Sequence, residues 1–390
     1  MRFTVISSTA QVIYITVDNP ILIEKFYSLL QRSDKGSTFV VQEYGDDFYN
    51  GLIDLKIYLG NNAGAFNGIL AYFQRLSKCE KFAIIPEKIE DTQYLFSLQA
   101  QIDEMNGKPN MFNLGTQDIF TSIYNLACYG WQRKNIGQPI KSKRKCRFCG
   151  KSIPETTFEK KSHAISEALG NKKVVCLEEC DCCNKYFGES IERDIINLFS
   201  PYRSLYKIKG KEGIPTSKGK NYKISKELSS FVLPFKSVED LKSRTFVLDT
   251  SNYKFIPQNV YRCLCKYVLS VVNRKLLDKF TDTILWIKGN KEFNRLPLLG
   301  FCNKSGMIDE PYLYVFTRKT INNDYPLLVG CFFVGSIGIF FIVPEDKTNI
   351  DIQSESLFDL LKNHPEYKDL IRTDFSGNLS VTTNYTLSFQ

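Results

Sequence analysis

The chain has 390 residues, of which 43% are apolar and 13% aromatic, so it is too hydrophobic for a disordered protein and long enough for two or three domains. Lys and Arg number 51 against 42 Asp and Glu, which gives a net charge of +9. Twelve cysteines without a basic, apolar leader favour a reducing, cytoplasmic compartment and metal ligation over a secreted, disulfide-bonded protein.

Residues 1–132 predict a mixed α/β domain. Residues 2–17 are rich in β-branched and aromatic side chains and predict one or two strands, and apolar runs predict strands at 38–44 and 81–85. Apolar residues at intervals of three to four predict helices at 21–30, 66–76, 93–105 and 117–129. The stretch has no glycine-rich phosphate loop and no His/Asp/Glu cluster, so we expect a role in recognition, regulation or oligomerisation.

Residues 133–145 predict a basic linker, because they are polar and contain Gly137 and Pro139. The charge changes at the same place. Residues 133–226 carry 22 Lys and Arg against 10 Asp and Glu, a net +12, whereas residues 1–132 carry −4 and residues 227–390 carry +1. A cationic surface of this kind predicts attraction to the phosphate backbone of a nucleic acid. The alternative is a solvated surface that binds nothing.

Two Cys-x-x-Cys pairs follow the linker and bracket His163, one of only two histidines in the chain. The pairs are Cys146 with Cys149 and Cys180 with Cys183. Four thiolates presented by two short loops suit one tetrahedral structural zinc ion, although the gap of thirty residues exceeds the roughly 15–20 of an ordinary zinc ribbon. We expect Cys182, which lies between two of these ligands, to point away. The alternative is a non-enzymatic zinc finger.

The residues around His163 predict two strands followed by a helix. Strand segments are expected at 162–165 and 173–176, and the spacing of apolar residues predicts a helix over 183–199. Residues 203–220 carry lysines separated by Gly and Pro, which predicts a β-ribbon or loop along a phosphate backbone, with little sequence selectivity. The alternative for this last segment is a disordered basic loop.

The segments CRFCGK, HAISEALGNK, ECDCCN, FGESIE and IKGKEG resemble the zinc-knuckle-supported branch of the HNH endonucleases. These are ββα-metal nucleases common in bacterial and phage genomes and often tied to defence against foreign DNA. The resemblance covers residues 146–213. It implies that His163 is the general base, that Asn171 holds the hairpin loop and orients the imidazole, and that Asn184 is a catalytic metal ligand. It also implies that the four cysteines bind structural zinc.

The sequence departs from the family at Ser162, where many members have an Asp, Glu or His that serves as a second catalytic metal ligand. Asp181 and Glu192 are the nearest carboxylates by sequence, and either is a candidate replacement. Glu192 lies two helical turns, about 11 Å, from Asn184, so both can reach one ion only through a water or a bend. A site with a neutral amide ligand is expected to bind Mg²⁺ or Mn²⁺ loosely, mainly together with DNA.

Residues 227–390 predict an α+β domain. An apolar stretch at 260–272 and the following 274–285 predict helices, whereas 312–318 and 327–343 predict buried strands. The last segment is interrupted by three glycines and is marginal in length for a membrane span, so we expect no membrane association. Cys263 and Cys265 lack the spacing of a zinc site and are expected in the core, and His364 is expected at the surface.

The sequence therefore predicts an α+β protein with a central zinc-stabilised ββα-metal module at 146–226, between an N-terminal α/β domain and a C-terminal α+β domain. The predicted function is a metal-dependent DNA endonuclease of low sequence specificity in prokaryotic anti-phage defence. The alternatives are a zinc-stabilised nucleic-acid-binding protein with a degenerate active site, and a toxin-like effector activated by an operon-encoded partner or by a ligand of the N-terminal domain. The predicted DNA contacts are Arg144, Lys145, Arg203, Lys207, Lys209 and Lys211.

Overall fold

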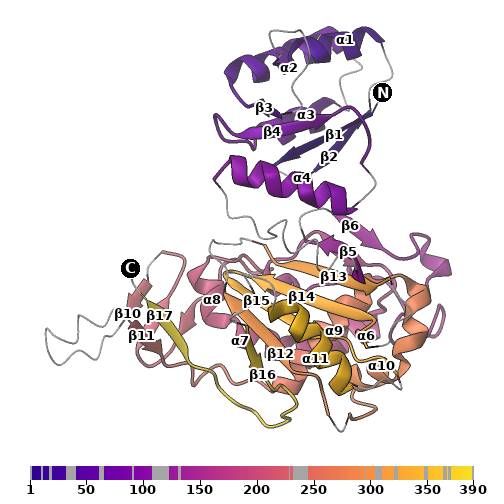
Figure 1. Cartoon of the computed structure of the whole chain (residues 1–390), viewed down its shortest axis with the longest axis vertical. Coiled ribbons are helices and arrows are strands. Elements are labelled where there is room, and N and C mark those ends of the chain that lie inside the picture. The colour runs from indigo at the N-terminus through magenta and orange to yellow at the C-terminus, as the bar shows by residue number, and fades with distance from the viewer. Residues whose placement is uncertain are drawn as a thin grey trace, which may run out of the picture. The chain divides into compact units, whose positions relative to one another are not determined.

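The structure is a computed structural model. It describes residues 2–9, 12–16, 20–31, 41–60, 66–89, 92–107, 123–130, 133–227, 229–231, 245–293, 295–303, 310–319, 324–346, 350–362, 367 and 370–388. The chain forms two compact units, Met1–Asp118 and Ile119–Gln390 (Figure 1). None of the described helices is both long and apolar enough to cross a bilayer.

The first unit is a four-stranded antiparallel sheet with helices on both faces. The strands lie in the order β2 (Ile13–Thr16), β1 (Arg2–Ser7), β4 (Lys81–Ile85) and β3 (Val41–Glu43). Helices α1 (Pro20–Ser28), α2 (Asp46–Leu59) and α3 (Phe66–Phe73) cover one face, and α4 (Thr92–Met105) covers the other (Figure 1). The predicted helices at 21–30, 66–76 and 93–105 and the strand at 81–85 are confirmed.

Alternation along β1 and β4 assigns their side chains to two cores. Phe3 of β1 and Phe82 of β4 pack with the three-helix layer, whereas Ile6 and Ile85 pack with α4. Successive strand residues point to opposite faces, so a strand covered on both sides reads as a continuous apolar run. This pattern explains why the short segment KFAII was readable as a buried strand.

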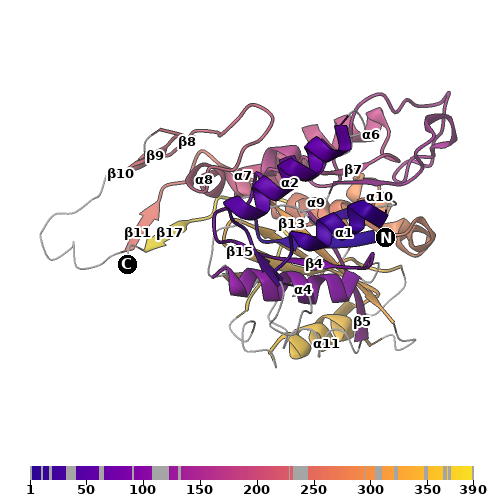
Figure 2. The ribbon, with the colours of Figure 1, turned by 90° about the horizontal axis from the view of Figure 1, so that it is seen from above.

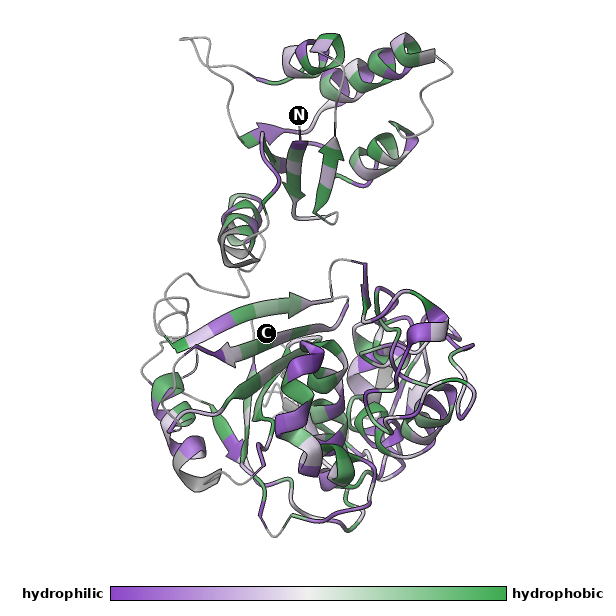
Figure 3. Ribbon diagram, turned by 90° about the vertical axis from the view of Figure 1, so that its right-hand side faces the viewer, coloured by the Kyte–Doolittle hydropathy of each residue, from purple (hydrophilic) through white to green (hydrophobic). Residues whose placement is uncertain are grey.

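The second unit is built on a six-stranded antiparallel sheet. Its order is β16 (Ile371–Thr373), β12 (Leu299–Asn303), β15 (Ile337–Ile342), β14 (Leu328–Val334), β13 (Tyr312–Arg318) and β5 (Tyr124–Tyr129). Hydrophobic residues dominate the central strands (Figure 3). The predicted strands at 312–318 and 327–343 are confirmed, the second as a hairpin that turns at Gly335 (φ +59°).

Strand β5 corrects two sequence expectations. Residues 124–129 form a strand that pairs with β13, with Ala127 opposite Val315, and not the predicted helix at 117–129, of which 117–122 lie outside the described residues. The burial pattern of β5 alternates, as expected for a strand at the edge of a sheet. The second unit thus begins at Ile119, before the predicted boundary at residue 132.

Two helices cover opposite faces of this sheet. Helix α9 (Pro257–Val271) is buried along nearly its whole length and packs against β13 and β14. Helix α11 (Ile350–Lys362) packs Phe358 against Gly300 of β12, where any Cβ would collide with the aromatic ring. Cys263 and Cys265 are buried in α9, as predicted for core residues, whereas His364 lies outside the described residues.

The central region is built into this same unit. It consists of β6 (Lys134–Ile136), β7 (Val174–Cys176), α6 (Asp181–Glu189), α7 (Ile191–Leu198) and α8 (Ser200–Leu205), with short 3₁₀ turns at η2 (Lys141–Lys143) and η3 (Glu167–Leu169). Phe187 and Ile195 share one hydrophobic core with Leu264 of α9 and Phe332 of β14. The predicted central module and C-terminal domain therefore form one body.

The predicted linker and the predicted long helix differ from the structure. Residues 134–136 form β6, which runs parallel to β7, and the following turn places Gly137 (φ +98°) directly against Glu178. The helix expected over 183–199 breaks at Ser190, whose hydroxyl donates a hydrogen bond to the Tyr186 carbonyl. A serine that bonds the preceding turn competes with helix continuation.

The remaining elements lie beyond α8 and α9. Strands β8 (Ser217–Lys218), β9 (Tyr222–Ile224) and β10 (Ser229–Phe231) form a small antiparallel sheet. Of the ribbon or loop predicted at 203–220, only 217–218 lie in this sheet, and 203–205 belong to α8. Strands β11 (Thr245–Leu248) and β17 (Tyr385–Ser388) lie side by side (Figure 2). The helix predicted at 260–272 corresponds to α9. The helix predicted at 274–285 corresponds to the 3₁₀ helix η5 (Arg274–Phe280) followed by α10 (Thr281–Ile287).

Candidate functional site

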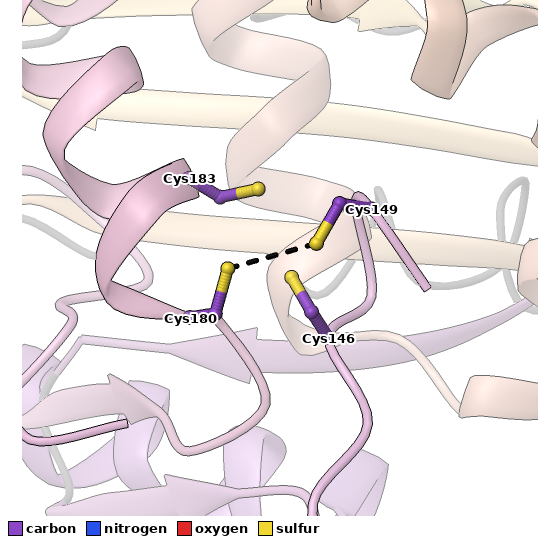
Figure 4. Close-up of side chains that lie close together, drawn as sticks. All are labelled: Cys146, Cys149, Cys180 and Cys183. Atoms are coloured by element: carbon purple, nitrogen blue, oxygen red, sulfur yellow. Dashed lines mark hydrogen bonds between the residues drawn. The ribbon is translucent and has the colours of Figure 1, made fainter. Parts of the chain in front are cut away.

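Four cysteine sulfurs meet at one point of the central region (Figure 4). The sulfurs of Cys146, Cys149, Cys180 and Cys183 all lie within 4.8 Å of one another, and the Cys149 and Cys180 sulfurs are 3.6 Å apart. A tetrahedral zinc ion with Zn–S bonds of about 2.3 Å holds its sulfurs about 3.8 Å apart. The four cysteines are therefore close enough together to bind one metal ion such as zinc.

Each Cys-x-x-Cys pair is shaped by its own local structure. In the first, the Cys146 N–H donates to Lys151 O, and the chain turns at Gly150, whose φ of +72° suits glycine. In the second, Cys180 precedes the first turn of α6, and the Asn184 N–H donates to its carbonyl. This turn leaves Cys182 exposed, which confirms that it points away from the cluster.

The thiols perturb one another strongly. A hydrogen bond from the Cys183 thiol lowers the pKa of Cys146 to about 5, whereas burial raises the pKa of Cys149 to about 11. Four thiols at this separation cannot all ionise alone, because like charges repel and three of the four are buried. A bound divalent cation removes that conflict and accepts four thiolates, which is the donor set of a structural zinc site.

The residues between the pairs form a two-stranded hairpin that carries His163. The Ala164 N–H donates to Val174 O, and the Cys176 N–H donates to Ser162 O, so residues 162–164 run antiparallel to β7. The His163 side chain is 14% exposed, and its Nδ1 lies 3.5 Å from Glu167 Oε2. Hairpin and α6 together form the ββα arrangement that the sequence predicted.

Burial lowers the pKa of His163 below its ordinary value of 6.5. The Lys161 and Lys266 cations also lower this pKa, whereas the Glu167 and Glu192 carboxylates raise it. The net effect keeps the imidazole neutral at cellular pH, the form in which one ring nitrogen can accept a proton.

Asn171 closes the hairpin loop. Its buried amide donates from Nδ2 to the carbonyls of Ile165 (2.8 Å) and Val174 (3.0 Å). Its Oδ1 accepts from the N–H groups of Lys173 (3.1 Å) and Val174 (3.0 Å). None of these bonds involves the imidazole, so any influence of Asn171 on His163 passes through the backbone of the loop.

The residues proposed for the catalytic metal have different surroundings in the structure. Asn184 is half-buried on α6, and its side chain makes no hydrogen bond to any part of the chain that is described. Ser162 is buried, and its hydroxyl donates to the carbonyl of Glu179 (3.2 Å). The break at Ser190 puts Glu192 on a different helix, α7, so the single helical face predicted for Asn184 and Glu192 does not exist.

Asp181 is occupied by the loop before the hairpin. Its carboxylate accepts hydrogen bonds from Thr157 Oγ1, from Glu159 N (2.9 Å) and from Lys160 N (2.8 Å). Partial burial opposes ionisation, but these donors outweigh it and hold the pKa of Asp181 below its ordinary value. This arrangement fixes the loop and argues against Asp181 as the replacement metal ligand.

Lys266 was missed by the sequence analysis. It projects from α9, its side chain is fully buried, and its Nζ lies 3.1 Å from each of three oxygens: Glu179 Oε2, Glu192 Oε1 and the carbonyl of His163. The signal in the sequence was one lysine inside the apolar run VYRCLCKYVLSVV, but its partners were not deducible from that run.

A second buried cation also joins α9 to the cysteine region. Arg147 Nε pairs with Glu178 Oε2 (3.0 Å), and its Nη1 donates to the carbonyls of Leu269 and Val272 at the end of α9. Arg274 Nη1 lies 3.2 Å from the same Glu178 oxygen. Cations bonded to the final carbonyls of a helix stabilise it.

The predicted DNA contacts fall into two groups. Lys145, Lys207, Lys209 and Lys211 are exposed. Arg144 is half-buried and donates to the carbonyls of Gln138 and Pro139. Arg203 is only 8% exposed and its guanidinium lies against Gly210, so the structure does not place it on the cationic surface predicted for it.

A hairpin and helix closed by a four-cysteine site define a zinc-knuckle ββα-metal domain. Residues 146–200 match the family model described as HNH endonuclease, so this segment is an HNH domain at the centre of an α+β fold. Comparisons with curated proteins and with solved structures gave no match. An HNH domain indicates nuclease activity with DNA as the substrate, which agrees with the resemblance in sequence.

Proposed function

We propose that the protein is a metal-dependent endonuclease that hydrolyses DNA phosphodiester bonds with His163 as the general base. The observation that carries the proposal is the position of His163 on the hairpin of the HNH domain, with an imidazole that burial keeps neutral. A neutral imidazole accepts a proton from the attacking water, whereas the imidazolium cannot. The hydrogen bonds of Asn171 hold the loop on which this depends.

Two metals have different roles in this proposal. The four cysteines hold a structural zinc ion, which closes the fold between the hairpin and α6. Asn184 is the proposed protein ligand of a catalytic Mg²⁺ or Mn²⁺, which when bound neutralises charge on the scissile phosphate. Since Ser162 and Asp181 are both engaged in other hydrogen bonds, this ion is expected to bind weakly and mainly with DNA.

Exposed lysines beyond α8 are the proposed contact with the DNA backbone. Lys207, Lys209 and Lys211 alternate with buried Ile208 and Gly210, so the three cations face solvent together. Lysine contacts to phosphates add affinity but no base readout, so low sequence specificity is expected. Such cleavage suits a role in prokaryotic defence against phage DNA.

The decisive experiment is cleavage of supercoiled plasmid in Mg²⁺ or Mn²⁺. The wild type is expected to nick and linearise DNA, His163→Ala is expected to lose activity, and His364→Ala, at the other histidine, is the matched control. Cleavage by His163→Ala at the wild-type rate would contradict the assignment. Retained DNA binding without cleavage by any form would favour a nucleic-acid-binding protein with a degenerate site.

A partner-activated effector is the second candidate, and a cavity in the first unit favours it. The cavity has a volume of about 510 Å³ and lies at the start of α2, where its lining includes Tyr44, Asp46, Asp47 and Lys78. If an operon-encoded partner or a small ligand acts there, the wild type will be silent alone and will cleave plasmid when phage-infected lysate is added. Equal activity with and without lysate would exclude this mode.

A further inference from the structure

Helix α9 contains a cation at a position where an apolar residue is expected. Thirteen of its fifteen residues are buried, and Lys266 is among those with no exposed surface. An ammonium group transferred from water to a protein interior costs several kcal/mol unless charged and polar partners replace its hydration. The partners of Lys266 therefore indicate why a lysine is present.

All three partners belong to the HNH domain. Lys266 Nζ donates hydrogen bonds to the carbonyl of His163 and to Glu192 Oε1, each at 3.1 Å, and forms an ion pair with Glu179 Oε2 at 3.1 Å. A lysine ammonium has three N–H donors, of which two make these hydrogen bonds, and the Glu179 carboxylate adds a buried opposite charge. Although burial opposes it, the two carboxylates raise the pKa of Lys266 above its ordinary value, so it stays charged.

We propose that Lys266 is a positioning residue of the nuclease site. It fixes the main chain that carries His163 and holds the Glu192 carboxylate beside the imidazole. This inference rests on the proposed function, since it assigns Lys266 to the support of the proposed base. A helix from outside the matched HNH segment thus completes the site.

A purely structural role is already filled by other residues. Arg147 ties the first cysteine loop to the end of α9 through Leu269 O and Val272 O, and it touches neither His163 nor Glu192. Lys266 differs because one of its acceptors is the carbonyl of His163 itself. The difference is measurable, because loss of a positioning contact changes both the titration of the imidazole and the rate of cleavage, whereas a packing change leaves the titration unaltered.

The charged groups around His163 set the direction of that change. Lys161 and Lys266 lower its pKa, and Glu167 and Glu192 raise it. Loss of the Lys266 charge therefore moves the His163 pKa upward, whereas loss of the Glu192 charge moves it downward. If substitutions at Lys266 and Glu192 shift the His163 pKa in opposite directions, the cause is electrostatic. General loosening of the fold would not produce shifts of opposite sign.

The experiment is an NMR titration of the histidines, which reads His163 whether or not the protein cleaves DNA. The chain has two histidines, so His163→Ala assigns the signals and His364 is the internal reference. Lys266→Met is the first variant. Lys266→Met combined with Glu179→Gln is the second, because it removes both charges of a fully buried pair and so preserves the fold if the single change does not.

The expected result is an upward shift of the His163 pKa in both Lys266 variants and a downward shift in Glu192→Gln. The cleavage rate of the double variant should fall about 10- to 100-fold, the usual effect of removing a supporting contact. Its loss of activity on acidification should occur at a higher pH than in the wild type. Leu264→Ala, a fully buried change on the same helix, is the control and should leave the pKa in place.

An unchanged His163 pKa in the folded double variant would overturn the inference, as would a shift no larger than that in Leu264→Ala. Failure of the proposed function gives a different result. In that case the wild type does not cut DNA, but the pKa of His163 still responds to Lys266 and Glu192 with opposite signs.

Discussion

Removal of the Asn171 side chain should loosen the hairpin that carries His163. In Asn171→Ala, the carbonyl of Ile165 and the N–H groups of Lys173 and Val174 lose their amide partner. The carbonyl of Val174 keeps a second bond, from the Ala164 N–H at 3.0 Å. Three groups that each lose a net contribution of about 1 kcal/mol give a destabilisation of about 3 kcal/mol.

The assay is urea unfolding followed by tryptophan fluorescence, with Asn197→Ala as the matched control. Asn197 is more accessible, and its amide donates a single bond, to Lys254 O, so its loss should cost about 1 kcal/mol or less. Cleavage by Asn171→Ala should also fall, because the loop between the two strands is no longer fixed. Equal destabilisation of the two variants would refute the reasoning, since it would mean that the bonds of Asn171 do not support the loop.

Three further predictions follow from the metal site, the base and the cationic surface. Elemental analysis should find one zinc per chain. The Cys180→Ser variant should lose both the zinc and the fold of the second unit, whereas Cys182→Ser should keep both. Wild-type protein that contains no zinc but has normal stability would exclude the site. The pKa of His163 is lowered and the base must be neutral, so the cleavage rate should fall on acidification with a midpoint below pH 6.5. A midpoint above pH 6.5 would contradict this assignment. Changing Lys207, Lys209 and Lys211 to Gln should reduce the salt dependence of DNA binding by a slope of about 2.7. Changing the exposed Lys275 and Lys279 to Gln is the control and should leave the salt dependence of DNA binding unaltered. An equal reduction per lysine in both variants would exclude a specific DNA-binding surface.

The features that the sequence predicted correctly are those encoded by neighbouring residues. Cys-x-x-Cys spacing places two sulfurs on one turn, so the four-cysteine cluster was readable without knowledge of the fold. The strands in the glycine-interrupted run at 327–343 were also readable, because helices cover their sheet on both sides and most of their residues are apolar. In both cases the deciding contacts lie within the segment or follow from its composition.

The features that the sequence missed depend on distant partners. Strand β5 has apolar residues spaced as in a helix, and only pairing with β13, nearly two hundred residues later, decides its conformation. Residues 133–145 look like a linker because they are polar, yet β6 finds a parallel partner in β7 and Gly137 packs on Glu178. The contact between Lys266 and His163 spans 103 residues and is likewise invisible to local reasoning.

The carboxylates near His163 suggest how a domain with Ser162 in place of an acidic residue can act as a nuclease. Family members that carry an acidic residue before the base have a negative charge at that point, whereas here the Ser162 hydroxyl is bonded to the Glu179 carbonyl. The Glu179 side chain is fully buried and pairs with the ammonium of Lys266, so it has no exposed oxygen to offer a metal ion. Glu192 is different, because it is 15% exposed and is held by the ammonium of Lys266. We therefore propose Glu192 as the carboxylate that replaces the missing one, held by Lys266 from a helix outside the matched domain.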